Sequence, residues 1–153
     1  MQKRFFHYTA ENRLEEILDS EVIKIATANL PKKVKPAAWF STNETWEHTA
    51  TKFAMDESGR LKELSLDEMI EMCGLARIEI EPTTPLITWA KYRHESGMSI
   101  QLADELEKIG YNKGAKPNEW YTSFRPVSID YWIRADVWRN GKWVEYEVFT
   151  DIE

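Results

Sequence analysis

The clearest pattern of apolar and polar positions lies near the end of the chain. Residues 131–138 and 143–150 are rich in aromatic and β-branched side chains and flank Asn140-Gly141, which is a strong signal for a type I′ hairpin turn. A two-residue turn there places Asp136 opposite Glu145. Because two facing carboxylates repel, we expect that side of the hairpin to be exposed to water.

Other segments also have the character of strands. Residues 75–81 alternate between apolar and polar or charged side chains, a period of two that is typical of a half-buried strand. The hairpin and the short links between elements favour antiparallel pairing, so the predicted class is α+β. The remaining predicted strands lie at residues 4–8, 22–25, 37–40 and within 117–124.

Helices are expected between these strands, and particular residues mark their ends. Thr9 can cap the first helix, and residues 41–44 and 65–68 are capping boxes, in which a serine side chain and a glutamate side chain bond each other's backbone. Gly110 is the natural end of the last helix. The apolar faces consist of Leu14, Ile17 and Leu18 in the first helix, Trp46, Ala50, Phe53 and Ala54 in the second, and Leu102, Leu106 and Ile109 in the last.

Composition narrows the class of protein. A chain of 153 residues forms a single domain, residues 1–153. The net charge of −6 argues against a general nucleic-acid binder but allows a small nucleotide ligand. Cys73 is the only cysteine, so an internal disulfide is impossible. Since no run of about 18 apolar residues is present, we expect no membrane span and a cytoplasmic location.

The candidate chemistry lies at three predicted strand ends. His7 follows two phenylalanines, Trp39 belongs to an aromatic run that ends in Ser41-Thr42, and Glu119 precedes the alternating run that starts at Trp120. A histidine, an aromatic face and a carboxylate together suit the binding of NAD and cleavage of its nicotinamide bond, which develops positive charge. The three histidines show no metal-ligand spacing, so no metal is expected.

The order of these segments resembles the catalytic domain of ADP-ribosyltransferases, in the His–Tyr–Glu branch that includes poly(ADP-ribose) polymerases and diphtheria toxin. Phe6-His7-Tyr8-Thr9 is similar to the His-Gly-Thr strand of that family, and Trp39-Phe40-Ser41 to its Tyr-Phe-Ala segment. Residues 75–81 resemble the apolar strand that follows, and Asn118-Glu119-Trp120-Tyr121 the Asn-Glu-Tyr strand. The resemblance implies a mostly antiparallel split sheet with peripheral short helices.

The resemblance also implies roles for individual residues. Glu119 would stabilise the charge that develops on the ribose, and His7 would bond the ribose hydroxyl on the adenosine side. The backbone of Tyr8, beside Thr9 in the same motif, would hold the nicotinamide amide. Trp39 would stack on the nicotinamide ring and Ser41 would bond its amide. A second aromatic wall would come from Trp46 or Phe53.

Three departures from the family pattern affect this interpretation. Tyr8 replaces the family's glycine, Trp39 replaces its stacking tyrosine, and Pro117 stands where arginine-modifying relatives have Glu or Gln. The hypothesis is therefore a mono-ADP-ribosyltransferase that uses NAD as co-substrate and needs no metal, with arginine disfavoured as the acceptor. A protein acceptor is favoured over nucleic acid, since the chain is acidic.

Simpler alternatives stay open at this point. His7 and Trp39 could be core residues, Ser41 a helix cap, and Glu119 a solvated charge at a strand end. The whole domain could be a catalytically silent module that binds NAD, ADP-ribose or a partner. It could also be an RNA 2′-phosphotransferase-like enzyme, or an inhibitor that acts through surface contact alone.

Overall fold

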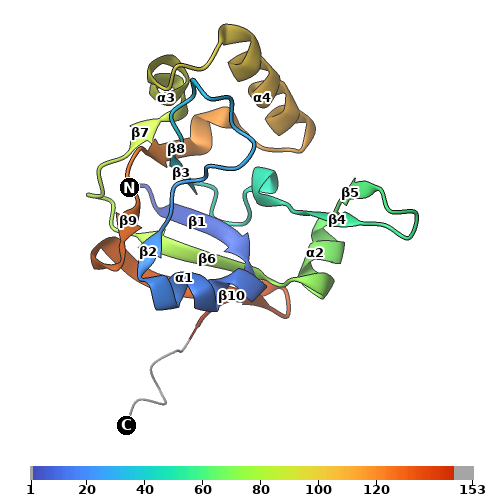
Figure 1. The fold of residues 1–153 in the computed structure, drawn as a ribbon. Coiled ribbons are helices and arrows are strands. Elements are labelled where there is room, and N and C mark those ends of the chain that lie inside the picture. The colour runs from blue at the N-terminus through green and yellow to red at the C-terminus, as the bar shows by residue number, and fades with distance from the viewer. Residues whose placement is uncertain (1, 147–153) are drawn as a thin grey trace.

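The computed structural model describes residues 2–146. Its centre is a seven-stranded sheet with the order β11-β10-β6-β1-β3-β8-β7, and every pairing in it is antiparallel (Figure 1). The predicted α+β class with a large antiparallel sheet is confirmed. The strands are β1 (Phe5–Ala10), β3 (Ala38–Ser41), β6 (Leu75–Ile80), β7 (Ile87–Thr88), β8 (Trp120–Ser123), β10 (Trp132–Arg139) and β11 (Lys142–Glu145).

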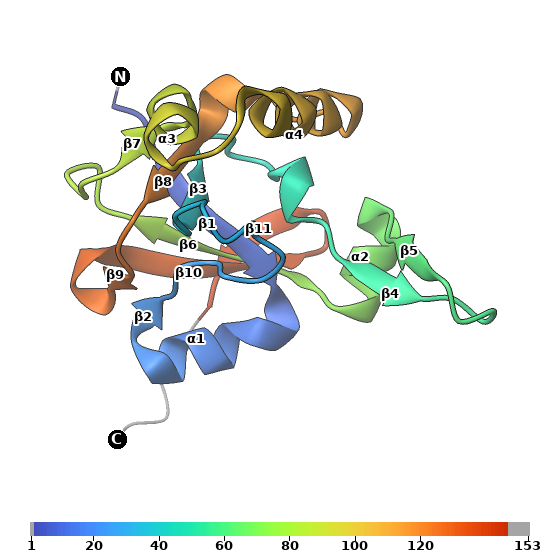
Figure 2. The same cartoon turned by 45° about the horizontal axis from the view of Figure 1, so that its top comes forward.

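Short helices and two small ribbons surround this sheet. Figures 1 and 2 show α3 and α4 together near β7 and β8, and α1 at the opposite end of the molecule near β10. The β4–β5 ribbon projects to one side, next to α2. The helices are α1 (Leu14–Ser20), α2 (Leu66–Met72), α3 (Trp89–Glu95) and α4 (Ile100–Asn112), with 3-10 turns η1 (Glu11–Arg13), η2 (His48–Ala50), η3 (Pro117–Glu119) and η4 (Ile129–Tyr131). The ribbons pair β2 (Val22–Ile23) with β9 (Val127–Ser128), and β4 (Phe53–Met55) with β5 (Leu61–Glu63).

The large sheet consists of two parts with a narrow join. Strands β1 and β6 pair along six residues, and β3 and β8 along four. Between β1 and β3, by contrast, Phe6↔Ser41 is the one register pair among the described residues. The sheet therefore divides into β11-β10-β6-β1 and β3-β8-β7, and side chains of β1 and β3 near the join are free to line a cavity.

The hairpin turn forms as predicted, but Asp136 on its charged side does not face water, whereas Glu145 opposite it is exposed. Asn140 and Gly141 have φ values of 52° and 79°, the left-handed conformation that a type I′ turn requires. Asp136 pairs with Glu145 in register, yet Asp136 is fully buried. The prediction of a solvated position was wrong for Asp136, because Arg77 on β6 lies opposite it and neutralises it. Residues 147–150 of the predicted second strand lie outside the described residues.

Residues 75–80 form β6, but the strand is buried along its whole length. The prediction of a half-buried strand was wrong because both faces of the strand are covered. Ala76, Ile78 and Ile80 pack in the core on one face, and on the other the rings of Phe6 and Trp143 lie over Arg77. Its two charged residues are accommodated by ion pairs. Arg77 binds Asp136, and Glu79 accepts two hydrogen bonds from the guanidinium of Arg4, at 2.9 and 3.0 Å. That guanidinium holds the pKa of Glu79 below its usual range.

The helix predicted after Ser41 does not form. The side-chain oxygen of Asn43 accepts hydrogen bonds from the amides of Thr45 (2.9 Å) and Trp46 (3.3 Å), which closes a local turn. Asn and Thr compete with helical hydrogen bonding in this way, and the segment has threonine at positions 42, 45, 49 and 51. Only the turn η2 is helical there, and Phe53 lies on β4 with 53% of its surface exposed.

The other helix signals had mixed outcomes. The capping box of Ser65 and Glu68 starts α2 as predicted. Thr9 instead belongs to β1, and α1 begins at Leu14 without a side-chain cap, so that prediction was wrong. Gly110 lies inside α4 rather than at its end. A β-carbon at this position would lie 2.6 Å from the ring of Trp120, so close packing rather than helix termination explains the glycine.

Candidate functional site

A cavity of about 450 Å³ lies where the two parts of the sheet meet. This size is typical of small-molecule sites. Its walls come from β1 and β3, from the segment between β3 and β4, from the end of α4, and from two tryptophans. The lining residues with polar or aromatic side chains are Phe6, His7, Tyr8, Trp39, Phe40, Ser41, Glu47, Thr49, Lys52, Trp89, Lys113 and Trp120.

Glu47 is the buried carboxylate of this cavity, with 7% of its surface exposed. One oxygen accepts a hydrogen bond from the hydroxyl of Ser41 at 2.8 Å. The other accepts three, from the amide and hydroxyl of Thr49 (3.2 and 2.6 Å) and from the indole N–H of Trp120 (3.2 Å). A buried charge is tolerated when its hydrogen-bonding capacity is met. These four donors therefore hold an ionised carboxylate in one orientation.

The sheet brings two of these donors together. Ser41 on β3 and Trp120 on β8 are directly paired, and opposite residues of an antiparallel pair project to the same face. Both side chains consequently reach the carboxylate of Glu47, one at each oxygen. Trp120 is 73 residues away from Glu47 in the chain.

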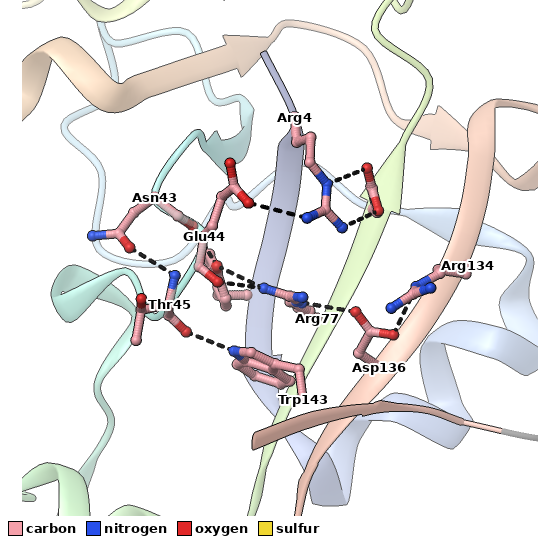
Figure 3. Close-up of polar contacts among 10 residues, drawn as sticks. Arg4, Asn43, Glu44, Thr45, Arg77, Arg134, Asp136 and Trp143 are labelled. Carbon is pink, nitrogen blue, oxygen red and sulfur yellow. Dashed lines mark hydrogen bonds and ion pairs between the residues drawn. The ribbon is translucent and has the colours of Figure 1, made fainter. Parts of the chain in front are cut away.

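Three long-range hydrogen bonds hold the segment that precedes Glu47, residues 43–45, here named the clamped segment (Figure 3). Its three carbonyls accept, in order, from the hydroxyl of Tyr8, the guanidinium of Arg77 at 2.7 Å and the indole N–H of Trp143 at 2.8 Å. Burial raises the pKa of Tyr8 to about 12, so its hydroxyl keeps the proton that it donates. Strands β1, β6 and β11 thus position the backbone that leads to Glu47.

Arg77 is the centre of this clamp. Its guanidinium lies between the rings of Phe6 and Trp143, with centroids 4.1 and 4.5 Å away, and its Nε donates to Asp136 at 2.8 Å. Arg134 forms a second ion pair with Asp136 at 2.9 Å. The stacked and paired guanidinium has little freedom to move, which makes it a rigid support for the clamped segment.

His7 lines the cavity from β1. Its Nδ1 lies 2.8 Å from the carbonyl oxygen of Trp39. Because a carbonyl only accepts, Nδ1 carries the proton, which leaves Nε2 of the neutral ring as an acceptor. Burial lowers the pKa of His7, so the neutral form is favoured. The hydrogen bond spans β1 and β3 close to their single register pair.

Aromatic side chains form one wall of the cavity. The ring of Trp39 contacts Tyr92 edge-to-face at 5.1 Å and Trp89 at 5.9 Å, and Trp89 contacts Trp120 at 5.3 Å. Such contacts between rings stabilise both packing and orientation. Trp39 is therefore packed on its neighbours and lines the cavity at the same time.

The structure gathers some of the sequence-predicted residues and separates others. His7, Tyr8, Trp39 and Ser41 line the cavity. The remaining four are not among its lining residues. Thr9 is buried on β1, Trp46 is buried against the ring of Tyr8 at 5.2 Å, and Phe53 is exposed on β4. Glu119 ends η3, half-buried, and its backbone oxygen accepts from the amide of Thr42 at 3.0 Å.

Glu47, Lys52 and Lys113 also line the cavity, although the sequence did not point to them. In the predicted helix Glu47 was not part of the apolar face, so the pattern did not mark it for burial. The available signal was Asn43 among several threonines, which indicates a turn instead of a helix.

Two further results bear on the site. No group of histidine, cysteine, aspartate or glutamate side chains within residues 2–146 has the arrangement of a metal site, and no helix in that range is long and apolar enough to cross a bilayer. Comparisons with protein-family models, with curated proteins and with solved structures found no match.

Proposed function

We propose that the cavity binds NAD and that the protein is a mono-ADP-ribosyltransferase. The observation that carries this proposal is Glu47, an anionic side chain held by four donors inside an aromatic cavity. The position of that cavity, at the join of two antiparallel half-sheets, agrees with the split sheet that the resemblance implies. His7 and Trp39 contribute to the same cavity.

The chemistry requires a fixed negative charge close to the sugar. The bond between the ribose C1 and the nicotinamide nitrogen breaks, and its electron pair stays on the nitrogen, so neutral nicotinamide leaves. The ribose then carries positive charge close to that of an oxocarbenium ion. An acceptor nucleophile forms the new bond to C1 and releases its proton to solvent or to a nearby base. Glu47 would stabilise the developing positive charge, and its donors would prevent it from turning away.

The other lining residues would orient the substrate. Trp39 would stack on the nicotinamide ring, and the backbone of Tyr8 would hold the carboxamide. Nε2 of His7, as an acceptor, would bond a ribose hydroxyl. The hydroxyl of Ser41 donates to Glu47, so Ser41 would position the carboxylate in place of binding nicotinamide. We propose a protein side chain as the acceptor.

Paired glutamine variants test the proposal and separate the two candidate carboxylates. Purified protein is incubated with NAD and candidate protein acceptors, and free nicotinamide and transferred ADP-ribose are measured. Removal of a preorganised charge costs about 10²- to 10³-fold in kcat, and we expect this loss for Glu47→Gln. Glu119→Gln is the matched control, because it makes the same chemical change next to Trp120 but outside the lining.

The outcomes of this experiment are distinct. If Glu119→Gln abolishes turnover and Glu47→Gln does not, the activity stands and the acid is the one that the resemblance implies. If the unmodified protein releases no nicotinamide with any acceptor, the enzymatic proposal fails. Melting temperatures of both variants show whether a loss of activity is a loss of folding.

A catalytically silent ligand-binding module is the second candidate. The observation that favours it is that the polar groups of the cavity already have partners within the chain: Ser41 and Trp120 bond Glu47, and His7 bonds a backbone carbonyl. Such a network also stabilises a scaffold without chemistry. Calorimetry with ADP-ribose distinguishes the two, because a silent module binds ADP-ribose while NAD stays intact.

A further inference from the structure

The charged side chains that line the cavity differ in whether they have partners. Glu47 accepts four hydrogen bonds. Lys113 forms an ion pair with Glu63 and lies over the ring of Phe53. Lys52 also lines the cavity, but within residues 2–146 no carboxylate lies within ion-pair distance of its ammonium group. It is therefore a cation that faces the cavity without a counter-charge in the described chain.

The backbone holds Lys52 at this position. It lies between η2 and β4, and its carbonyl accepts the amide of Leu64 at 2.9 Å across the β4–β5 ribbon. The residue is exposed as a whole, as expected for a lysine stem that runs along a cavity wall, while its ammonium group is partly withdrawn from water. Lys52 is thus both exposed and part of the cavity lining, at the rim of the cavity.

The local environment favours an anion at this rim. Withdrawal from water lowers the pKa of Lys52, and the charge of Arg13 lowers it further. Burial is the main cause that lowers the pKa of His7, and the positive charge of Lys52 lowers it as well. Both side chains line the same cavity. A ligand anion beside Lys52 would offset both the withdrawal of its ammonium group from water and the charge of Arg13. The reason is that a nearby opposite charge favours the ionised lysine.

We propose that Lys52 binds a phosphate group of the ligand, and that for NAD this is the diphosphate between the two riboses. The inference rests on the proposed function for the identity of the ligand. Lysine is suited to this role because its ammonium group is a point charge with three donors, which pairs with phosphate oxygens without a strict geometry. Lys52 would then set the position of the diphosphate relative to Glu47.

The test compares ligands that differ only in their phosphates. Binding is measured by calorimetry with the carbocyclic analogue of NAD, whose nicotinamide bond does not break, with the carbocyclic analogue of nicotinamide riboside, and with inorganic pyrophosphate. Loss of one charge-assisted hydrogen bond corresponds to about 10- to 100-fold in affinity. We expect Lys52→Gln to weaken binding of the NAD analogue by about that factor and binding of the riboside analogue by less than about 2-fold.

Lys62→Gln is the matched control. Lys62 lies on β5 of the neighbouring ribbon, is exposed, pairs with Glu68 at 3.0 Å and does not line the cavity. We expect this variant to bind all three ligands as the unmodified protein does. The inference is overturned if Lys52→Gln binds the NAD analogue normally, or if it weakens both analogues equally, since the lysine would then shape the cavity without recognising phosphate.

Failure of the proposed function has a different signature. If the unmodified protein binds neither analogue but binds pyrophosphate in a manner that requires Lys52, the phosphate site stands and NAD is the wrong ligand. If it binds none of the three, both the phosphate site and NAD binding are refuted.

Discussion

Replacement of Asp136 by asparagine removes one negative charge from the centre of the clamp. Asp136 is completely buried and is the counter-charge of Arg77, whose side chain is 5% exposed. Arg134 also lies within 2.9 Å of the same carboxylate. Asparagine has nearly the same shape and can still accept one hydrogen bond, so the change isolates the charge. Two guanidinium groups would be left without their buried anion.

The size of the effect follows from this burial. Loss of one partner of a buried ion pair costs about 3–5 kcal/mol, because the remaining charge stays in a region that hydrates it poorly. For a domain of this length each kcal/mol lowers the melting temperature by about 2–4 °C. We therefore expect Asp136→Asn to reduce the melting temperature by about 6 to 20 °C.

Urea unfolding followed by tryptophan fluorescence measures the loss in free energy of unfolding, since the chain has seven tryptophans. Glu145→Gln is the control, because Glu145 is exposed and lies directly opposite Asp136 in the hairpin. A surface change of this kind alters stability by about 0.5 kcal/mol or less. If Asp136→Asn costs less than about 1 kcal/mol, the pair is no stronger than a surface ion pair and the reasoning about the clamp is refuted.

Three further predictions follow from other contacts. Trp143→Phe removes one donor to the clamped segment, so amide hydrogen exchange there should accelerate, whereas Trp138→Phe, which removes an indole with no bond to that segment, should leave exchange unchanged. Burial holds the pKa of His7 below its ordinary value of about 6.5. Just below that pH the unfolded chain therefore binds more protons than the folded one, so the free energy of unfolding should fall as the pH is lowered. In His7→Gln this fall should be absent when unfolding is measured at a series of pH values. Gly110→Ala should lower the melting temperature, although this change inside a helix normally stabilises by about 1 kcal/mol, because the new methyl group collides with Trp120; an unchanged or higher value would contradict the observed packing.

Local chemistry explains which features could be predicted from sequence. The turn at Asn140-Gly141 depends on two residues that tolerate positive φ, and the capping box depends on Ser65 and Glu68, three positions apart. The register of the hairpin then follows from the length of the turn. These features arise within a few residues, so the sequence was sufficient for them, and it was also sufficient for an α+β class with antiparallel pairing.

The helix predicted after Ser41 shows where local patterns stopped being sufficient. Apolar residues do recur there at helical spacing, but the side chain of Asn43 closes a turn and the clamp holds the carbonyls that a helix would use. This change of backbone moved Phe53 to the surface and placed Glu47 in the cavity. His7, Tyr8 and Trp39 were predicted correctly as cavity residues. Their positions could be inferred because the strands that carry them are recognisable in the sequence.

By itself the sequence determined the turns, one helix start, most of the strands and the candidate segments, since each depends on neighbouring residues. Only the tertiary structure decided which acids are buried and paired. Arg77 and Asp136 are 59 residues apart, and Trp120 and Glu47 are 73 apart. The energy of a charge depends on whether water or a distant partner surrounds it. That partner is brought close only when the sheet assembles, so no local pattern distinguishes Glu47 from a solvated glutamate.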